Sequence, residues 1–139
     1  MTNDYLIVQS GEAKILTWND IPGALATLDL SADIALTAFN PATKTIGLAR
    51  NVTSQLLQEF LISLLSPDST LLYPTLQVRI IAGKDALENQ NKLKEILLGI
   101  YQADNNNNFI NIVSADIDDD SAPQSFKLTS FDGQIEVFT

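Results

Sequence analysis

The spacing of the apolar residues constrains the fold of this chain most, because its period changes along the sequence. Up to about residue 50, short apolar runs are separated by turn-forming residues, as in β-strands. From Thr53 to Pro67, leucine and phenylalanine recur at three- and four-residue spacing, which predicts a helix with Thr53 as its N-cap. Residues 86–101 repeat this helical spacing. The pattern predicts an α/β layer protein, with two main helices packed on a mixed, mainly antiparallel β-sheet core.

Turn-forming residues indicate which strands are expected to pair. Gly11 predicts a hairpin between residues 5–8 and 13–18. The loop Asn40-Pro-Ala-Thr-Lys44 predicts a second hairpin, and Asp132-Gly133 predicts a third near the C-terminus. Residues 25–30 are predicted to be a further strand or an extended segment. The other predicted strands cover residues 5–8, 13–18, 33–39, 45–49, 76–82, 109–114, 125–129 and 134–138.

Two absences exclude most hydrolase mechanisms. The 139 residues contain no cysteine, which removes disulfides, thiolate metal sites and a thiol nucleophile. They contain no histidine, which removes the commonest general base and the commonest metal ligand. We therefore expect no cofactor and no metal. The length fits one domain over residues 1–139.

The charge of the chain excludes another class of partner. Seventeen acidic residues against eight basic ones give a net charge of −9. The basic residues are scattered, so a phosphate backbone would be repelled and no nucleic-acid binding is expected. Residues 103–139 hold seven acidic residues against Lys127 alone, which predicts an acidic end of the fold. The start of the sequence lacks a signal-peptide pattern and no apolar run could span a bilayer, so a cytoplasmic protein without membrane insertion is expected.

An acidic run near the C-terminus has the first spacing of a calcium loop. Asp116, Asp118 and Asp120 stand at positions 1, 3 and 5 of such a loop. Ser121 and Lys127 stand where the loop requires glycine and glutamate. The run is therefore interpreted as a solvated acidic loop after a strand.

A turn between a predicted strand and a predicted helix has some features of a phosphate-binding turn. Gly83-Lys84-Asp85 occupies this place, where the N-terminus of a helix favours anions. Neither the phosphate-binding nor the dinucleotide-binding glycine pattern is present. A plain turn is expected, with Asp85 as the N-cap of the helix.

Several motifs together resemble the CheD-type chemoreceptor glutamine deamidases. The first is Thr27-Leu-Asp-Leu-Ser-Ala-Asp33-Ile-Ala-Leu, and the second is Asn40-Pro-Ala-Thr-Lys-Thr-Ile-Gly-Leu-Ala-Arg50. Similar patterns continue to the C-terminus, so the resemblance covers roughly residues 5–138. It implies a layered α-β-β sandwich with the helices on one side. The later matching segments are residues 78–83, residues 87–91, Asp116 and the closing hairpin over 126–137 with Gly133.

The resemblance also implies where the catalytic residues would stand. The family uses a cysteine nucleophile, a histidine base and a threonine that orients the histidine. Without gaps, these fall on Asp33, Arg50 and Thr27, so only the threonine is kept. Two glycines of the family are likewise replaced, by Asp118 and Asp119. Carboxylate is a poor nucleophile toward an amide and arginine stays protonated, so no catalytic residue is expected.

Thr27, Asp33 and Arg50 are thus predicted to be the remnant of a catalytic site. We interpret Asp33 and Arg50 as a salt bridge that replaces the catalytic pair. The alternative is two unrelated surface charges.

These observations favour a non-catalytic, CheD-like protein that binds a protein partner or regulates it in chemotaxis or another signalling pathway. Such a module predicts a plugged or shallow site and an exposed apolar patch elsewhere. One alternative is a hydrolase that uses Asp33 with Thr27 to activate water, which predicts a dry, concave pocket around Asp33. A further alternative is the subunit of a structural homo-oligomer.

Overall fold

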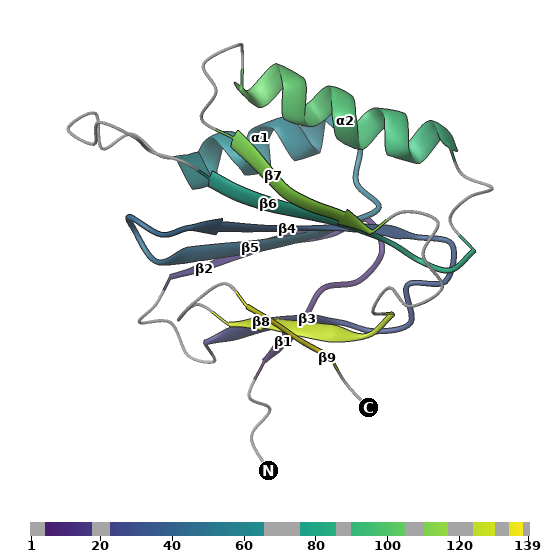
Figure 1. Cartoon of the computed structure of the whole chain (residues 1–139), viewed down its shortest axis with the longest axis horizontal. Helices are drawn as coiled ribbons and strands as arrows, with labels where there is room; N and C mark the ends of the chain where they lie inside the picture. The colour runs from purple at the N-terminus through teal and green to yellow at the C-terminus, as the bar shows by residue number, and fades with distance from the viewer. Residues whose placement is uncertain are drawn as a thin grey trace.

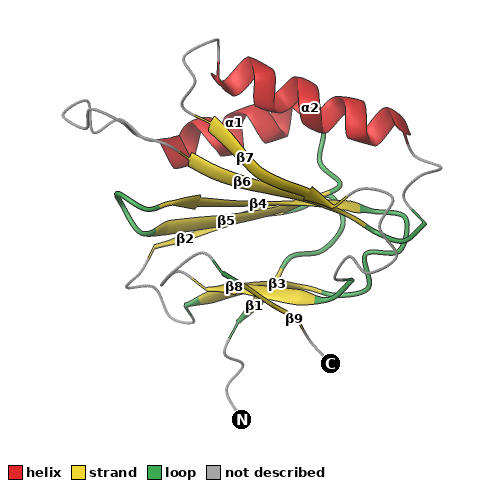
Figure 2. Cartoon of the chain, viewed as in Figure 1, coloured by secondary structure: helices red, strands yellow, loops and turns green. Residues whose placement is uncertain are grey.

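In the computed structural model, the described residues form three layers (Figure 1). Helices α1 (Ser54–Leu65) and α2 (Gln90–Asp104) cover one face of a five-stranded sheet, and a four-stranded sheet packs on its other face. Figure 2 shows the helices confined to one side of the strands. The predicted α/β sandwich, with two helices on mixed and mainly antiparallel sheets, is confirmed. The structure describes residues 5–17, 23–65, 76–85, 90–104, 110–116, 124–129 and 134–137.

The five-stranded sheet contains the hairpin that was predicted on either side of residues 40–44. Its order is β2-β5-β4-β6-β7, and every pair is antiparallel except β6 with β7. The predicted hairpin around residues 40–44 is confirmed as β4 and β5. The strands are β2 (Ala13–Thr17), β4 (Ile34–Asn40), β5 (Thr45–Arg50), β6 (Leu76–Ala82) and β7 (Ile110–Asp116).

The four-stranded sheet joins the two ends of the chain. Its order is β1-β3-β8-β9, with β1 parallel to β3 and the other pairs antiparallel. The predicted pairing of the last two strands is confirmed, whereas their Asp132-Gly133 turn lies outside the described residues. The strands are β1 (Leu6–Ile7), β3 (Ala24–Thr27), β8 (Phe126–Thr129) and β9 (Ile135–Val137).

The predicted hairpin between residues 5–8 and 13–18 is wrong. Strand β1 pairs with β3 in one sheet, and β2 pairs with β5 in the other. Gly11 lies between them at a φ of 85°, and its N–H donates to the Arg50 carbonyl (2.7 Å). The turn therefore carries the chain from one layer to the next.

Two apolar cores lie on the two faces of the five-stranded sheet. Ile34, Leu36 and Ala38 of β4 face the helices, whereas Ala35 of the same strand faces the other sheet. This alternation follows from the pleat of a strand that is buried on both faces. Phe126 is fully buried in the core between the sheets.

Helix α1 is positioned by its N-cap and by a glycine beneath it. The Leu56 N–H donates to Thr53 Oγ1 (3.2 Å), which confirms the predicted N-cap. A Cβ on Gly47 of β5 would lie 2.5 Å from the Phe60 ring, so glycine lets the helix approach the sheet. The buried face consists of Leu57, Phe60, Leu61 and Leu64.

Helix α2 buries only part of its apolar surface. Ile96 and Ile100 are buried, whereas Leu97 and Tyr101 are exposed. The predicted cap at Asp85 would act on residues 86–89, which lie outside the described residues. In the described ranges, neither helix combines the length and the hydropathy needed to cross a membrane.

Replacing Asn40 with alanine should lower the free energy of unfolding by about 1–3 kcal/mol. The buried Asn40 side chain donates to the Leu64 carbonyl at the end of α1 (2.9 Å) and accepts from the Ala42 N–H (3.0 Å). Its loss leaves the Leu64 carbonyl without this donor. Urea denaturation would measure the change, with Thr43→Ala in the exposed turn as the control. Equal effects of the two substitutions would contradict this role.

Candidate functional site

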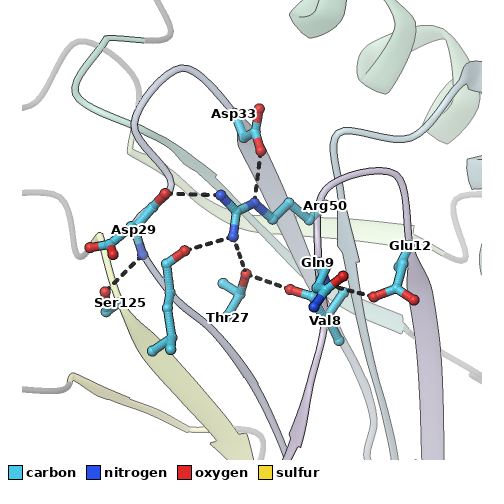
Figure 3. A network of polar contacts seen from close by, with 9 residues as sticks. Val8, Gln9, Glu12, Thr27, Asp29, Asp33, Arg50 and Ser125 are labelled. Carbon is cyan, nitrogen blue, oxygen red and sulfur yellow. Dashed lines mark hydrogen bonds and ion pairs between the residues drawn. The ribbon is translucent and has the colours of Figure 1, made fainter.

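The predicted ion pair between Asp33 and Arg50 is present. Arg50 ends β5 and Asp33 immediately precedes β4, and Arg50 Nε lies 2.8 Å from Asp33 Oδ2 (Figure 3). Their side chains are only 13% and 20% exposed. The alternative of two unrelated surface charges is thereby excluded.

Arg50 makes further contacts through its two terminal nitrogens (Figure 3). Arg50 Nη1 donates to Thr27 Oγ1 (2.9 Å) and to the Leu28 carbonyl (2.7 Å). Arg50 Nη2 donates to the Asp29 carbonyl (2.9 Å). We call Arg50, Asp33, Thr27 and the carbonyls of Leu28 and Asp29 the Arg50 network. Every guanidinium nitrogen therefore has a partner within it.

The Arg50 network joins the two sheets. Thr27 ends β3 of the four-stranded sheet, whereas Arg50 ends β5 of the five-stranded sheet. The buried Thr27 hydroxyl also donates to the Val8 carbonyl (2.8 Å), which ties the segment after β1 to the same point. The arrangement fixes the relative positions of three chain segments at one end of the sandwich.

The loop from Leu28 to Asp33 has an unusual backbone that is held from several sides. Asp29 and Ser31 have φ values of 50° and 53°, in the left-handed region that non-glycine residues seldom adopt. The Leu30 N–H donates to the Gln124 carbonyl (3.0 Å). A Cβ on Gly83 would overlap the Ser31 backbone, so glycine at the end of β6 permits this close approach. The surrounding contacts maintain a conformation that is strained by itself.

The segment 25–30, predicted as a strand or an extended segment, forms a strand only as far as Thr27. Strand β3 ends at Thr27, and the left-handed conformation of Asp29 stops the extended run. The three carbonyl and hydroxyl acceptors of residues 27–29 can then converge on one guanidinium.

The Arg50 network has the chemistry of a structural link. A guanidinium has five N–H donors and no acceptor, so it takes no proton from a substrate. Asp33 Oδ2 faces Arg50, and the Thr27 hydroxyl hydrogen is directed to the Val8 carbonyl. The Thr27 hydroxyl and Asp33 Oδ2 are thus both engaged in contacts that hold the chain segments together.

A pocket of about 250 Å³ lies beside the network. Its lining residues are Asp29, Ser31, Lys84 and Gln124, and they include neither Asp33 nor Thr27. It therefore differs from the concave pocket around Asp33 that the hydrolase alternative predicts. The Gly83-Lys84-Asp85 turn and the motif from Thr27 to Asp33 are visible in the sequence, but no pattern in it places Gln124 beside them.

The structure describes only the first residue of the acidic run that follows β7, and it places no metal site there. Asp116 is the last residue of β7, and residues 117–123 lie outside the described part of the chain. Among the residues that the structure describes, no three carboxylate side chains are grouped closely enough to hold a metal ion.

Comparison with known proteins gives one informative similarity. No family model matches the chain. The chain is 37% identical over 60 residues to an uncharacterized protein of Rickettsia conorii. The matched stretch covers 43% of this chain and 80% of the Rickettsia protein.

Proposed function

This chain belongs to the same family as the uncharacterized Rickettsia conorii protein, and we propose that it is a non-catalytic, CheD-like module that binds a protein partner in the cytoplasm. The motifs that resemble the deamidases run in the same order along the chain, and the layered fold is the one that the resemblance implies. Both support a common scaffold.

The Arg50 network is the observation that carries the proposal. It occupies the positions to which the resemblance assigns the threonine, cysteine and histidine of the deamidases, and its guanidinium binds Asp33, Thr27 and the carbonyls of Leu28 and Asp29. The replacement of the thiol and the imidazole therefore fills the site instead of leaving an open catalytic centre. A plugged site of this kind favours binding over turnover.

Exposed apolar side chains on α2 and β7 support a role in protein binding. Leu97, Leu98 and Tyr101 of α2 are 46%, 47% and 63% exposed. Ile112 and Val113 of the edge strand β7 are also nearly half exposed. Large exposed apolar side chains one helical turn apart, as Leu97 and Tyr101 are, are typical of surfaces that a partner covers.

An ammonia-release assay tests the absence of catalysis. The purified chain should release no ammonia above background from glutamine-containing receptor peptides, because it contains neither a cysteine thiolate nor a histidine base. An active CheD deamidase serves as the positive control. Turnover by the wild-type chain that disappears in Asp33→Ala would overturn the proposal and favour the hydrolase alternative.

A further inference from the structure

The pocket beside the Arg50 network is formed where loops from both sheets meet. Asp29 and Ser31 come from the loop after β3, Lys84 follows β6, and Gln124 precedes β8. The pocket volume of about 250 Å³ is below the roughly 300–1,000 Å³ of sites for drug-sized ligands. A ligand of this pocket must therefore be small.

Among the described lining residues, the pocket presents one positive and one negative charge, and the Asp85 carboxylate stands at its edge, where Oδ2 accepts from the Ser31 hydroxyl (3.2 Å). Within the described part of the chain, neither the Asp29 carboxylate nor the Lys84 ammonium forms an ion pair. Figure 3 shows the Asp29 carboxylate turned away from the Arg50 guanidinium, which binds the Asp29 carbonyl instead. Both charges remain available to a ligand.

The backbone of both charged residues is fixed. The Asp29 N–H donates to Ser125 Oγ (2.9 Å), and the Lys84 N–H donates to Gln124 Oε1 (2.8 Å). Ser31 is held on the other side, since its carbonyl accepts from the Asp85 N–H (2.8 Å). The opposite charges are thus carried on a preorganised frame, which lowers the entropic cost of binding.

The charges determine the class of ligand. A simple anion would meet the Asp29 carboxylate, and a simple cation would meet the Lys84 ammonium. A small zwitterion satisfies both, while the polar groups of Ser31 and Gln124 hold the frame, since the Ser31 hydroxyl donates to Asp85 Oδ2 and Gln124 Oε1 accepts from the Lys84 N–H. We propose that this pocket binds a free α-amino acid, with its ammonium group on Asp29 and its carboxylate on Lys84. This site is independent of the proposed protein-binding role.

Titration of the 139-residue chain with each of the common amino acids tests the site. Amide shifts of Asp29, Ser31 and Lys84 in ¹H–¹⁵N spectra are the measurement. At least one amino acid should give saturable shifts with a dissociation constant below about 1 mM. The analogues of that amino acid that lack either the amino or the carboxyl group should bind at least tenfold more weakly.

Two substitutions test the role of each charge. Asp29→Asn and Lys84→Met should each weaken binding at least tenfold, and asparagine tolerates the left-handed backbone of position 29. Glu59→Gln on α1 and Lys94→Met on α2 are the matched controls and should bind as the wild type. The spectra also show whether each variant is folded. Absence of any saturable shift up to 10 mM, equal binding of an analogue that lacks one charge, or equal binding by Lys84→Met would overturn the proposal.

Discussion

Replacing Arg50 with methionine should lower the free energy of unfolding by about 3 kcal/mol, at the lower end of the range for breaking a buried ion pair. The substitution keeps an apolar stem but leaves the Asp33 carboxylate without its cation. It also removes the donors to Thr27 Oγ1 and to two backbone carbonyls. Because these acceptors lie at and just after the end of β3, whereas Arg50 ends β5 of the other sheet, the loss of the contacts should loosen this end of the sandwich. Urea denaturation followed by circular dichroism would measure the difference.

Arg79→Met is the matched control for this prediction. Arg79 lies in β6 of the same sheet and forms no ion pair with the described residues. Its replacement should therefore change the stability much less. Arg50→Lys should fall between the two, because an ammonium group keeps the charge but not the forked geometry of the guanidinium. Similar losses for Arg50→Met and Arg79→Met would contradict a special role of the Arg50 network.

Replacing Phe126 with alanine should lower the free energy of unfolding by about 3–5 kcal/mol. Phe126 of β8 is fully buried in the core between the two sheets and lies opposite Thr27 in the strand pairing. A cavity at this point would weaken the packing that holds Thr27 beside Arg50. Thermal and urea denaturation would both report the loss.

Phe39→Ala provides the comparison within the same core. Phe39 of β4 packs against the core between the sheets but is only partly buried. Its truncation therefore removes less buried surface and should cost less than that of Phe126. A larger loss for Phe39→Ala than for Phe126→Ala would contradict the described packing between the sheets.

The local pattern of the sequence was enough to predict the elements of the helical face. The spacing from Thr53 to Leu65 matched α1, because a helix that packs on one face must repeat its apolar residues every three to four positions. The β4–β5 hairpin followed from the turn-forming loop between two apolar runs. Such features depend on neighbouring residues, so the sequence displays them directly.

The distribution of strands between the sheets could not be predicted in the same way. The runs before and after Gly11 look like partners in a hairpin, yet they enter different layers. Strand β1 is only two residues long and pairs with β3, which lies further along the chain. Alternation shows that a segment is extended but does not show which strand it pairs with.

The candidate site was predictable only in its side chains. Asp33 and Arg50 were paired through a family resemblance, and the structure confirms their contact. The role of the Leu28 and Asp29 carbonyls as acceptors for Arg50 could not be predicted. Every residue type supplies a carbonyl, and only the backbone conformation determines where it points. The pocket could not be predicted either, because Gln124 lines it from a part of the sequence that is distant from the other lining residues.

The coupling free energy between Asp33 and Arg50 is the most direct measure of whether this pair is a structural link. A double-mutant cycle with Asp33→Ala, Arg50→Ala and the double variant gives this quantity from three unfolding curves and that of the wild type. We expect a coupling of about 2 kcal/mol, as for residues that share one polar network. Additive losses, with a coupling within about 0.5 kcal/mol of zero, would mean that Asp33 does not depend on Arg50, and the account of a filled catalytic site would then be contradicted.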